Sequence, residues 1–152
     1  RIRPNVRYKD FEVNVALNYI NTDVINVSST GMLEGSDQLK SEALGINVNN
    51  PGYLKLNLFF NILILDVSSS GFVDMSLKVN TFEAGVSSAG HVEIRGQVVD
   101  QAVDISNGTY SKGFKIISQR TFVNVSSGCW AQVHARKKLD AHASSGGSVE
   151  LG

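Results

Sequence analysis

The 152-residue sequence is short of three features that would each indicate a class of protein. It has no excess charge, because 14 basic residues balance 14 acidic ones, whereas nucleic-acid-binding domains usually carry a basic surplus. Its single cysteine, Cys129, excludes an internal disulfide. Its longest apolar run, 58–65, contains Asn61 and is too short to cross a bilayer. We therefore expect no nucleic-acid partner and no transmembrane segment.

What the sequence does contain is a repeated phrase: an apolar residue, a Ser or Asn pair, and a glycine. The intervals between successive phrases are 18 to 21 residues, which random serine clusters would not maintain along a chain. Such a period is typical of solenoid proteins. The apolar residues that open the seven phrases are Val27, Val48, Val67, Val86, Ile105, Val125 and Ala143.

Apolar residues also recur at steps of two around each phrase, which predicts strands with one buried face. Two residues before the phrase stand Ile25, Ile46, Leu65, Ala84, Val103, Val123 and Ala141. A weaker row two residues earlier holds Asp23, Leu44, Leu63, Phe82, Gln101, Thr121 and Leu139. Behind the turn glycines stand Leu33, Leu54, Val73, Val92, Tyr110, Trp130 and Val149, and we expect Trp130 to plug the tube near its C-terminal end.

These patterns predict an all-β fold, a single-stranded parallel β-helix (β-solenoid) of about seven coils with a period near 19–20 residues. We expect residues 1–22 to form an N-terminal cap with entry strands and residues 23–152 to form the solenoid, within one domain. The turn glycines are expected to supply positive φ angles. A β-sandwich of evenly spaced hairpins would not readily explain why the same turn residues recur in every repeat.

The C-terminal half resembles a known family. The segment 135–152, ARKKLDAHASSGGSVELG, is similar to the closing repeat of the putative auto-transporter adhesin, head GIN domain family, and 111–128 and 86–106 resemble its preceding repeats. The resemblance implies a β-helix without a catalytic centre, exported to the periplasm, outer membrane or cell surface of Gram-negative bacteria, with a role in adhesion. A sister family of adhesins with short β repeats is the alternative assignment.

Two carboxylates give the chain an enzymatic alternative. Asp74 and Glu93 follow the turns of adjacent coils, so stacking would pair them, and glycoside hydrolysis requires two carboxylates. The same row continues with Ser111 and Ala131, and Lys55 and Arg95 could neutralise its charges. A polysaccharide-active enzyme, a pectin-lyase-like protein or a glycosidase, is therefore the second interpretation. A serine triad is disfavoured, because the serine pair is copied along the chain without a G-x-S-x-G motif.

No cofactor or metal is expected from the residues. An outward row of oxygen-bearing side chains could hold calcium, but no known calcium loop is present. The row consists of Asn26, Asn47, Asp66, Asp104 and Asn124. Cys129, His134 and His142 lack the spacing of transition-metal ligands.

The candidate binding residues follow the turn glycines of neighbouring coils. Tyr53, Phe72 and His91 would form an outward stripe, with Asp74 and Glu93 two residues further along their strands. Such a stripe could bind a sugar, a protein or another subunit, or it could shield the turn backbone. We therefore predict a non-catalytic, exported or cell-surface module, an adhesin or scaffold that binds carbohydrate or a surface protein and self-associates through its ends or faces.

Overall fold

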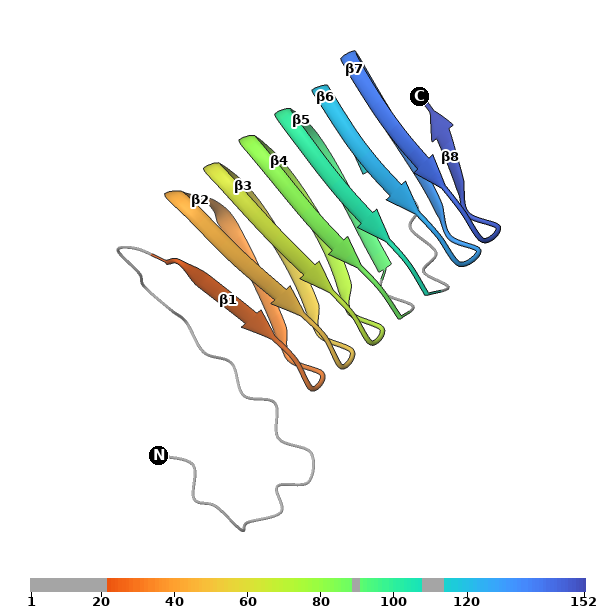
Figure 1. Cartoon of the computed structure of the whole chain (residues 1–152). Helices are drawn as coiled ribbons and strands as arrows, with labels where there is room; N and C mark the ends of the chain where they lie inside the picture. Colours follow the sequence, from red (N-terminus) through yellow and green to blue (C-terminus); the bar gives the residue numbers. More distant parts are fainter. Residues whose placement is uncertain (1–21, 89–90, 108–113) are drawn as a thin grey trace, which may run out of the picture.

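The computed structural model describes residues 22–88, 91–107 and 114–152, and every regular element within these ranges is a β-strand (Figure 1). Nearly all of the cap predicted at 1–22 lies outside them, as do Tyr110 and Ser111. The strands are β1 (Val24–Val27), β2 (Met32–Val48), β3 (Tyr53–Val67), β4 (Phe72–Val86), β5 (His91–Ile105), β6 (Phe114–Val125), β7 (Trp130–Ala143) and β8 (Ser148–Leu151). Each strand pairs in parallel with the next along the chain, which confirms the predicted β-solenoid.

Each long strand bends near its middle, so that one coil has two faces (Figure 1). In β3 the pairing with β4 runs to Phe60 and resumes at Ile62, which leaves Asn61 out of the ladder. Phe60 and Leu63 are both buried, and this odd spacing within a strand requires the chain to turn a corner. The six long strands, β2 to β7, make about six turns rather than the predicted seven, because β1 and β8 each cover only four residues of a coil.

The register between coils confirms the predicted inner rows. Val48, Val67, Val86, Ile105 and Val125 pair in sequence and are all buried. The rows that precede them pair in the same way and line the tube: Ile46, Leu65, Ala84, Val103 and Val123 in one, and Leu44, Leu63, Phe82, Gln101 and Thr121 in the other. The core is therefore a set of side-chain ladders along the solenoid axis.

The predicted row of inward residues behind the turn glycines is wrong at Trp130, by one residue. Trp130 is half-buried and pairs with Ser148, whereas Ala131 is fully buried and pairs with Val149. Trp130 therefore lies on the outer side and does not plug the tube. By the same shift, Gln132 takes the place in the outer charged row that the sequence assigned to Ala131.

The shift arises in the turn before Trp130. In the turn of β3 to β4, the N–H of Gly71 donates to the carbonyl oxygen of Ser68 (3.0 Å). Here the N–H of Cys129 makes the corresponding bond to Ser126 (3.3 Å), so a buried cysteine occupies the glycine position. The prediction took Gly128, one residue earlier, as the turn glycine. Every inner and outer position predicted after it in this strand is therefore one residue too early.

The left-handed residues of the turns are mainly serines and asparagines rather than the closing glycines. Ser69 and Ser70 have φ angles of 51° and 67°, and positive φ at both central residues is typical of a type I′ turn. Gly71 is needed for a different reason, since a Cβ there would lie 2.6 Å from the carbonyl oxygen of Val48 in the preceding coil. The prediction that this glycine supplies the positive φ is therefore wrong: it permits the close approach of two coils.

Replacing Leu65 with Asp should unfold the domain, because Leu65 is fully buried and an unpaired carboxylate in the ladder costs several kcal/mol, roughly 3–5. The neighbouring Ile64 is 45% exposed on the outer face, so Ile64→Asp should change the free energy of unfolding by only about 0.5 kcal/mol. Urea titration measures both. Equal losses in the two variants would contradict the register.

The geometry of this turn predicts opposite changes in stability for substitutions at two adjacent residues. Ser70→Gly should stabilise the domain by up to about 1 kcal/mol, because it removes the cost of a left-handed serine. Gly71→Ala should destabilise it by about 1–3 kcal/mol, because the new methyl group would overlap the Val48 carbonyl. Thermal unfolding of the two variants should shift the melting temperature in opposite directions; a rise for Gly71→Ala would refute the close approach.

Candidate functional site

Three rings are stacked along the edge of the solenoid where the turns lie. Tyr53, Phe72 and His91 pair in register on three successive coils, and each is half-buried. The ring centroids of Tyr53 and Phe72 are 5.1 Å apart with an interplanar angle of 10°. Those of Phe72 and His91 are 4.7 Å apart at 13°. The structure thus brings together the three aromatic positions named from the sequence.

The backbone holds these rings in place. The N–H of Phe72 donates to the carbonyl oxygen of Gly52 in the coil before (2.8 Å), and the N–H of His91 does the same to Gly71 (2.8 Å). The residue that follows each ring is buried, as Val73 is after Phe72, so strand alternation directs the rings outward. The ladder is therefore part of the hydrogen-bonded tube rather than of a free loop.

Stacking determines which part of the rings a ligand can meet. Because the faces of Phe72 lie against Tyr53 and His91, the outward surface is a strip of ring edges. Two coil spacings of about 4.8 Å give this strip a length of roughly 10 Å. Aromatic edges are apolar but carry a partial positive charge, so they accommodate apolar groups and oxygen atoms.

Two residues further along β4 and β5, the predicted carboxylates lie beside each other. Asp74 pairs in register with Glu93, and Lys55 precedes them in the same row. One nitrogen of Arg95, Nη2, donates to Asp74 Oδ1 (2.8 Å) and to Glu93 Oε1 (3.3 Å). Arg95 therefore links the two carboxylates across the coils and, as predicted, neutralises part of their charge.

We name the stacked rings and this ion cluster together the turn-edge site; its members are Tyr53, Phe72, His91, Asp74, Glu93 and Arg95. Its carboxylates accept hydrogen bonds, its guanidinium donates them, and its ring edges offer apolar contact. All three charged side chains are partly exposed, so their ion pairs contribute little to stability and remain accessible to a ligand. Among the described residues, no group of His, Cys, Asp and Glu is arranged to hold a metal ion.

The oxygen-bearing row considered for calcium forms hydrogen bonds within itself. Asn47 Nδ2 donates to Asn26 Oδ1 (2.9 Å), and Asn124 Nδ2 donates to Asp104 Oδ2 (3.2 Å). These are polar ladders between equivalent positions of adjacent coils. They give Asn26, Asn47, Asp104 and Asn124 a structural role in the contact between coils.

The ion pair between Asp100 and Arg120 was not predicted, although the two residues are one repeat apart in the sequence. Arg120 lies 20 residues after Asp100, directly opposite it on the next coil. Its Nη2 donates to Asp100 Oδ2 (2.6 Å) and its Nε to Oδ1. These hydrogen bonds, with the positive charge of Arg120, hold the pKa of Asp100 below its ordinary value; the same bonds, with the negative charge of Asp100, raise the pKa of Arg120. Opposite charges one repeat apart are thus the signal for such pairs.

Comparison with known proteins gives a family and no individual relative. No curated protein and no solved structure matches the chain. Among the described residues there is no helix long and apolar enough to span a membrane. A family model matches residues 1–152, the whole chain, and it is the family that the C-terminal repeats resemble. The chain belongs to the family described as putative auto-transporter adhesin, head GIN domain.

Proposed function

We propose that this domain is a non-catalytic adhesive module that acts outside the cytoplasm, in the periplasm, at the outer membrane or on the cell surface, and that its turn-edge site contacts a carbohydrate or a protein. The family description suggests an adhesin-like head domain, a surface or extracytoplasmic protein and a role other than catalysis. The ligand class and the contact residues are the parts that we add.

The observation that carries the proposal is the in-register stack of Tyr53, Phe72 and His91 beside the cluster around Arg95. Tyrosine and arginine are, with tryptophan, enriched among the residues that dominate the binding energy of protein–protein interfaces. Here they are fixed to a hydrogen-bonded tube, so little conformational entropy is lost on binding. A rigid edge of this kind suits an extended partner that spans several coils.

The opposing explanation is that the rings only shield the turn backbone. Phe72 stacks on two neighbours, and each aromatic contact contributes about 0.5–1.5 kcal/mol, so a purely structural role is physically reasonable. The two explanations differ in what a substitution changes. Shielding predicts a loss of stability alone, whereas a ligand site predicts a loss of binding in a domain that is still folded.

Phe72→Ser should abolish the adhesion that depends on the turn-edge site while leaving most molecules folded at low temperature. The measurement is the retention of beads coated with the domain on a glycan array and on intact Gram-negative cells, with circular dichroism as the test of folding. Phe122→Ser is the control, because it makes the same substitution at a phenylalanine that is 46% exposed and lies on the other face of the coil. Retention equal to that of the unmodified domain in both variants would contradict the turn-edge site.

The enzymatic alternative uses Asp74 and Glu93 as a catalytic pair. Because Arg95 bonds to both carboxylates, we expect no cleavage of polysaccharides by the unmodified domain. The double variant Asp74→Asn, Glu93→Gln should keep most of its glycan binding. Reducing-end assays on a panel of plant and bacterial polysaccharides measure the activity. Reproducible cleavage that disappears in the double variant would replace the adhesive function with a glycosidase or lyase.

A further inference from the structure

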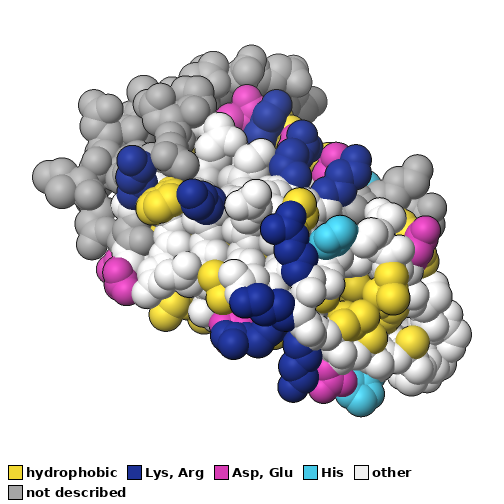
Figure 2. Space-filling model, turned by 90° about the horizontal axis from the view of Figure 1, so that it is seen from above, with side chains coloured by type: hydrophobic (Ala, Val, Ile, Leu, Met, Phe, Trp, Pro, Cys, Tyr) yellow, Lys and Arg dark blue, Asp and Glu magenta, His cyan; other side chains and the backbone are white. Residues whose placement is uncertain are grey.

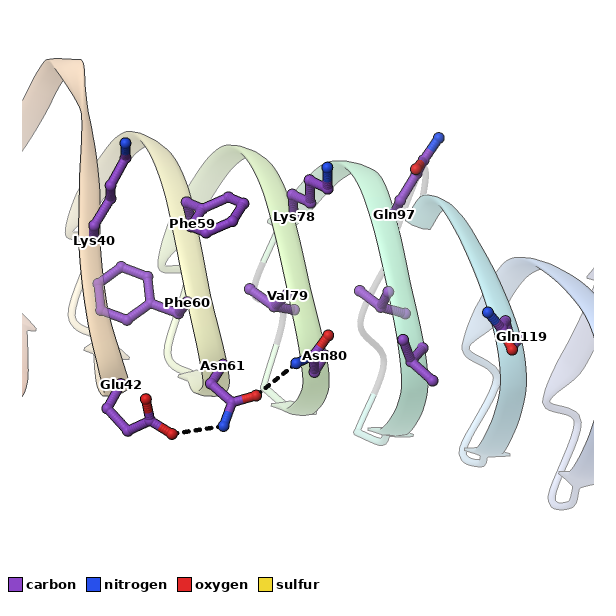
Figure 3. A pocket seen from close by; sticks show the side chains of 12 residues that line it. Lys40, Glu42, Phe59, Phe60, Asn61, Lys78, Val79, Asn80, Gln97 and Gln119 are labelled. Carbon is purple, nitrogen blue, oxygen red and sulfur yellow. Dashed lines mark hydrogen bonds between the residues drawn. The ribbon is translucent and has the colours of Figure 1, made fainter.

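A second candidate site lies at the opposite end of each coil from the turns, where the long strands bend. A shallow groove there crosses β2 to β6 over the buried side chain of Phe60 (Figure 3). We call it the bend groove and define it by Lys40, Phe59, Lys78, Asn80, Gln97 and Gln119. It shares no residue with the turn-edge site.

An exposed ring between two lysines forms the centre of the bend groove. Lys40, Phe59 and Lys78 pair in register on three successive coils. Phe59 is 42% exposed, and each lysine Nζ lies 5.9 Å from its ring centroid. Cation–π attraction of this kind contributes about 0.5–1 kcal/mol at an exposed site and keeps both ammonium groups beside the ring. Neither lysine has an ion pair among the side chains that the structure describes.

Amide groups line the wall of the bend groove below the ring (Figure 3). Asn80 Nδ2 donates to Asn61 Oδ1 (2.6 Å), and Asn61 Nδ2 donates to Glu42 Oε1 (2.6 Å). This chain of bonds fixes the orientation of the Asn80 amide. On the next coils, Gln97 pairs with Lys78 and so continues the row of Phe59, and Gln119 adds an amide from β6. Amides both donate and accept hydrogen bonds, as sugar hydroxyls require.

The surroundings of the bend groove are basic although the whole chain is neutral. Arg136, Lys137 and Lys138 occupy the bend of β7, where the register between β6 and β7 shifts, and all three are exposed. Figure 2 looks down on this side of the molecule and shows Lys and Arg side chains spread across it, with Asp and Glu side chains beside some of them. These lysines and arginines attract an anionic partner, and the acidic side chain that lines the groove, Glu42, accepts a hydrogen bond from Asn61.

We propose that the bend groove binds an acidic polysaccharide, one whose sugars carry carboxylate or sulfate groups. Lys40 and Lys78 pair with two acidic groups of the chain, roughly 10 Å apart, since they stand two coil spacings of about 4.8 Å from each other. Phe59 contacts the apolar side of the sugar between them, and the amides bond to hydroxyl groups. The polysaccharide runs along the solenoid axis, across the coils.

The chemistry of the bend groove favours a polysaccharide over other polyanions. A nucleic acid is held by many phosphate contacts and by several stacking rings, whereas this groove offers two lysines and one exposed ring. The amide wall adds groups that suit hydroxyl-rich sugars. The inference is independent of the turn-edge site, because the two surfaces lie at opposite ends of the coil.

The experiment measures binding of the domain to polygalacturonate and dextran sulfate, with neutral dextran and single-stranded DNA as comparison ligands. We expect affinity for at least one of the two acidic polysaccharides and none for neutral dextran. Lys40→Gln with Lys78→Gln should lower the affinity at least about tenfold, and Phe59→Ala should lower it about fivefold. Added salt should weaken binding, because the lysine contacts are exposed.

Three controls separate the bend groove from general charge attraction and from the turn-edge site. Lys55→Gln removes one exposed lysine near the turns and should change the affinity less than about twofold. Phe72→Ser should leave polyanion binding unchanged. Circular dichroism confirms that each variant is folded. Absence of binding to both acidic polysaccharides, a loss in Lys55→Gln as large as in the double variant, or DNA binding with the same dependence on Lys40 and Lys78 would overturn the proposal.

Discussion

In-register hydrogen bonding between successive coils is the constraint on which the rest of the structure depends. It places each residue against its equivalent about one repeat later, so that Leu65 meets Ala84 inside the tube and Phe72 meets His91 outside it. The close approach also explains the turn, where Gly71 leaves room for the carbonyl group of Val48. A chain with this constraint must repeat its polarity along the axis, and it therefore builds rows rather than isolated sites.

Those rows give the molecule two chemically different edges. The turn edge carries stacked rings and paired carboxylates bridged by Arg95, whereas the bend carries Phe59 between two lysines. Both are attached to continuous strands, so their side chains are spaced by the coil repeat and not by loop conformation. Membership in an adhesin head family suits a rigid body of this kind, whose surfaces are long and narrow.

Features that follow the period could be predicted from the sequence, and features that break it could not. The repeat located the inner ladders and the rows of Tyr53 and Asp74, because period and register coincide. Trp130 was misplaced because Cys129 takes the position of the turn glycine, which shifts the count by one. The bend groove was missed for another reason: Lys40, Phe59 and Lys78 are 19 residues apart, but only the burial pattern around Asn61 shows where each strand turns its corner.

The most direct test of this account is disulfide trapping between coils. Ile64 and Glu83 are exposed and pair in register, about 4.8 Å apart, so Ile64→Cys with Glu83→Cys should form a disulfide under mild oxidation. Ile64→Cys with Thr81→Cys sets a diagonal pair about 8 Å apart, beyond the reach of a disulfide, and the native Cys129 is buried. Mass spectrometry should find rapid crosslinking in the first variant alone. Equal crosslinking in both, or none in the first, would contradict the in-register stack.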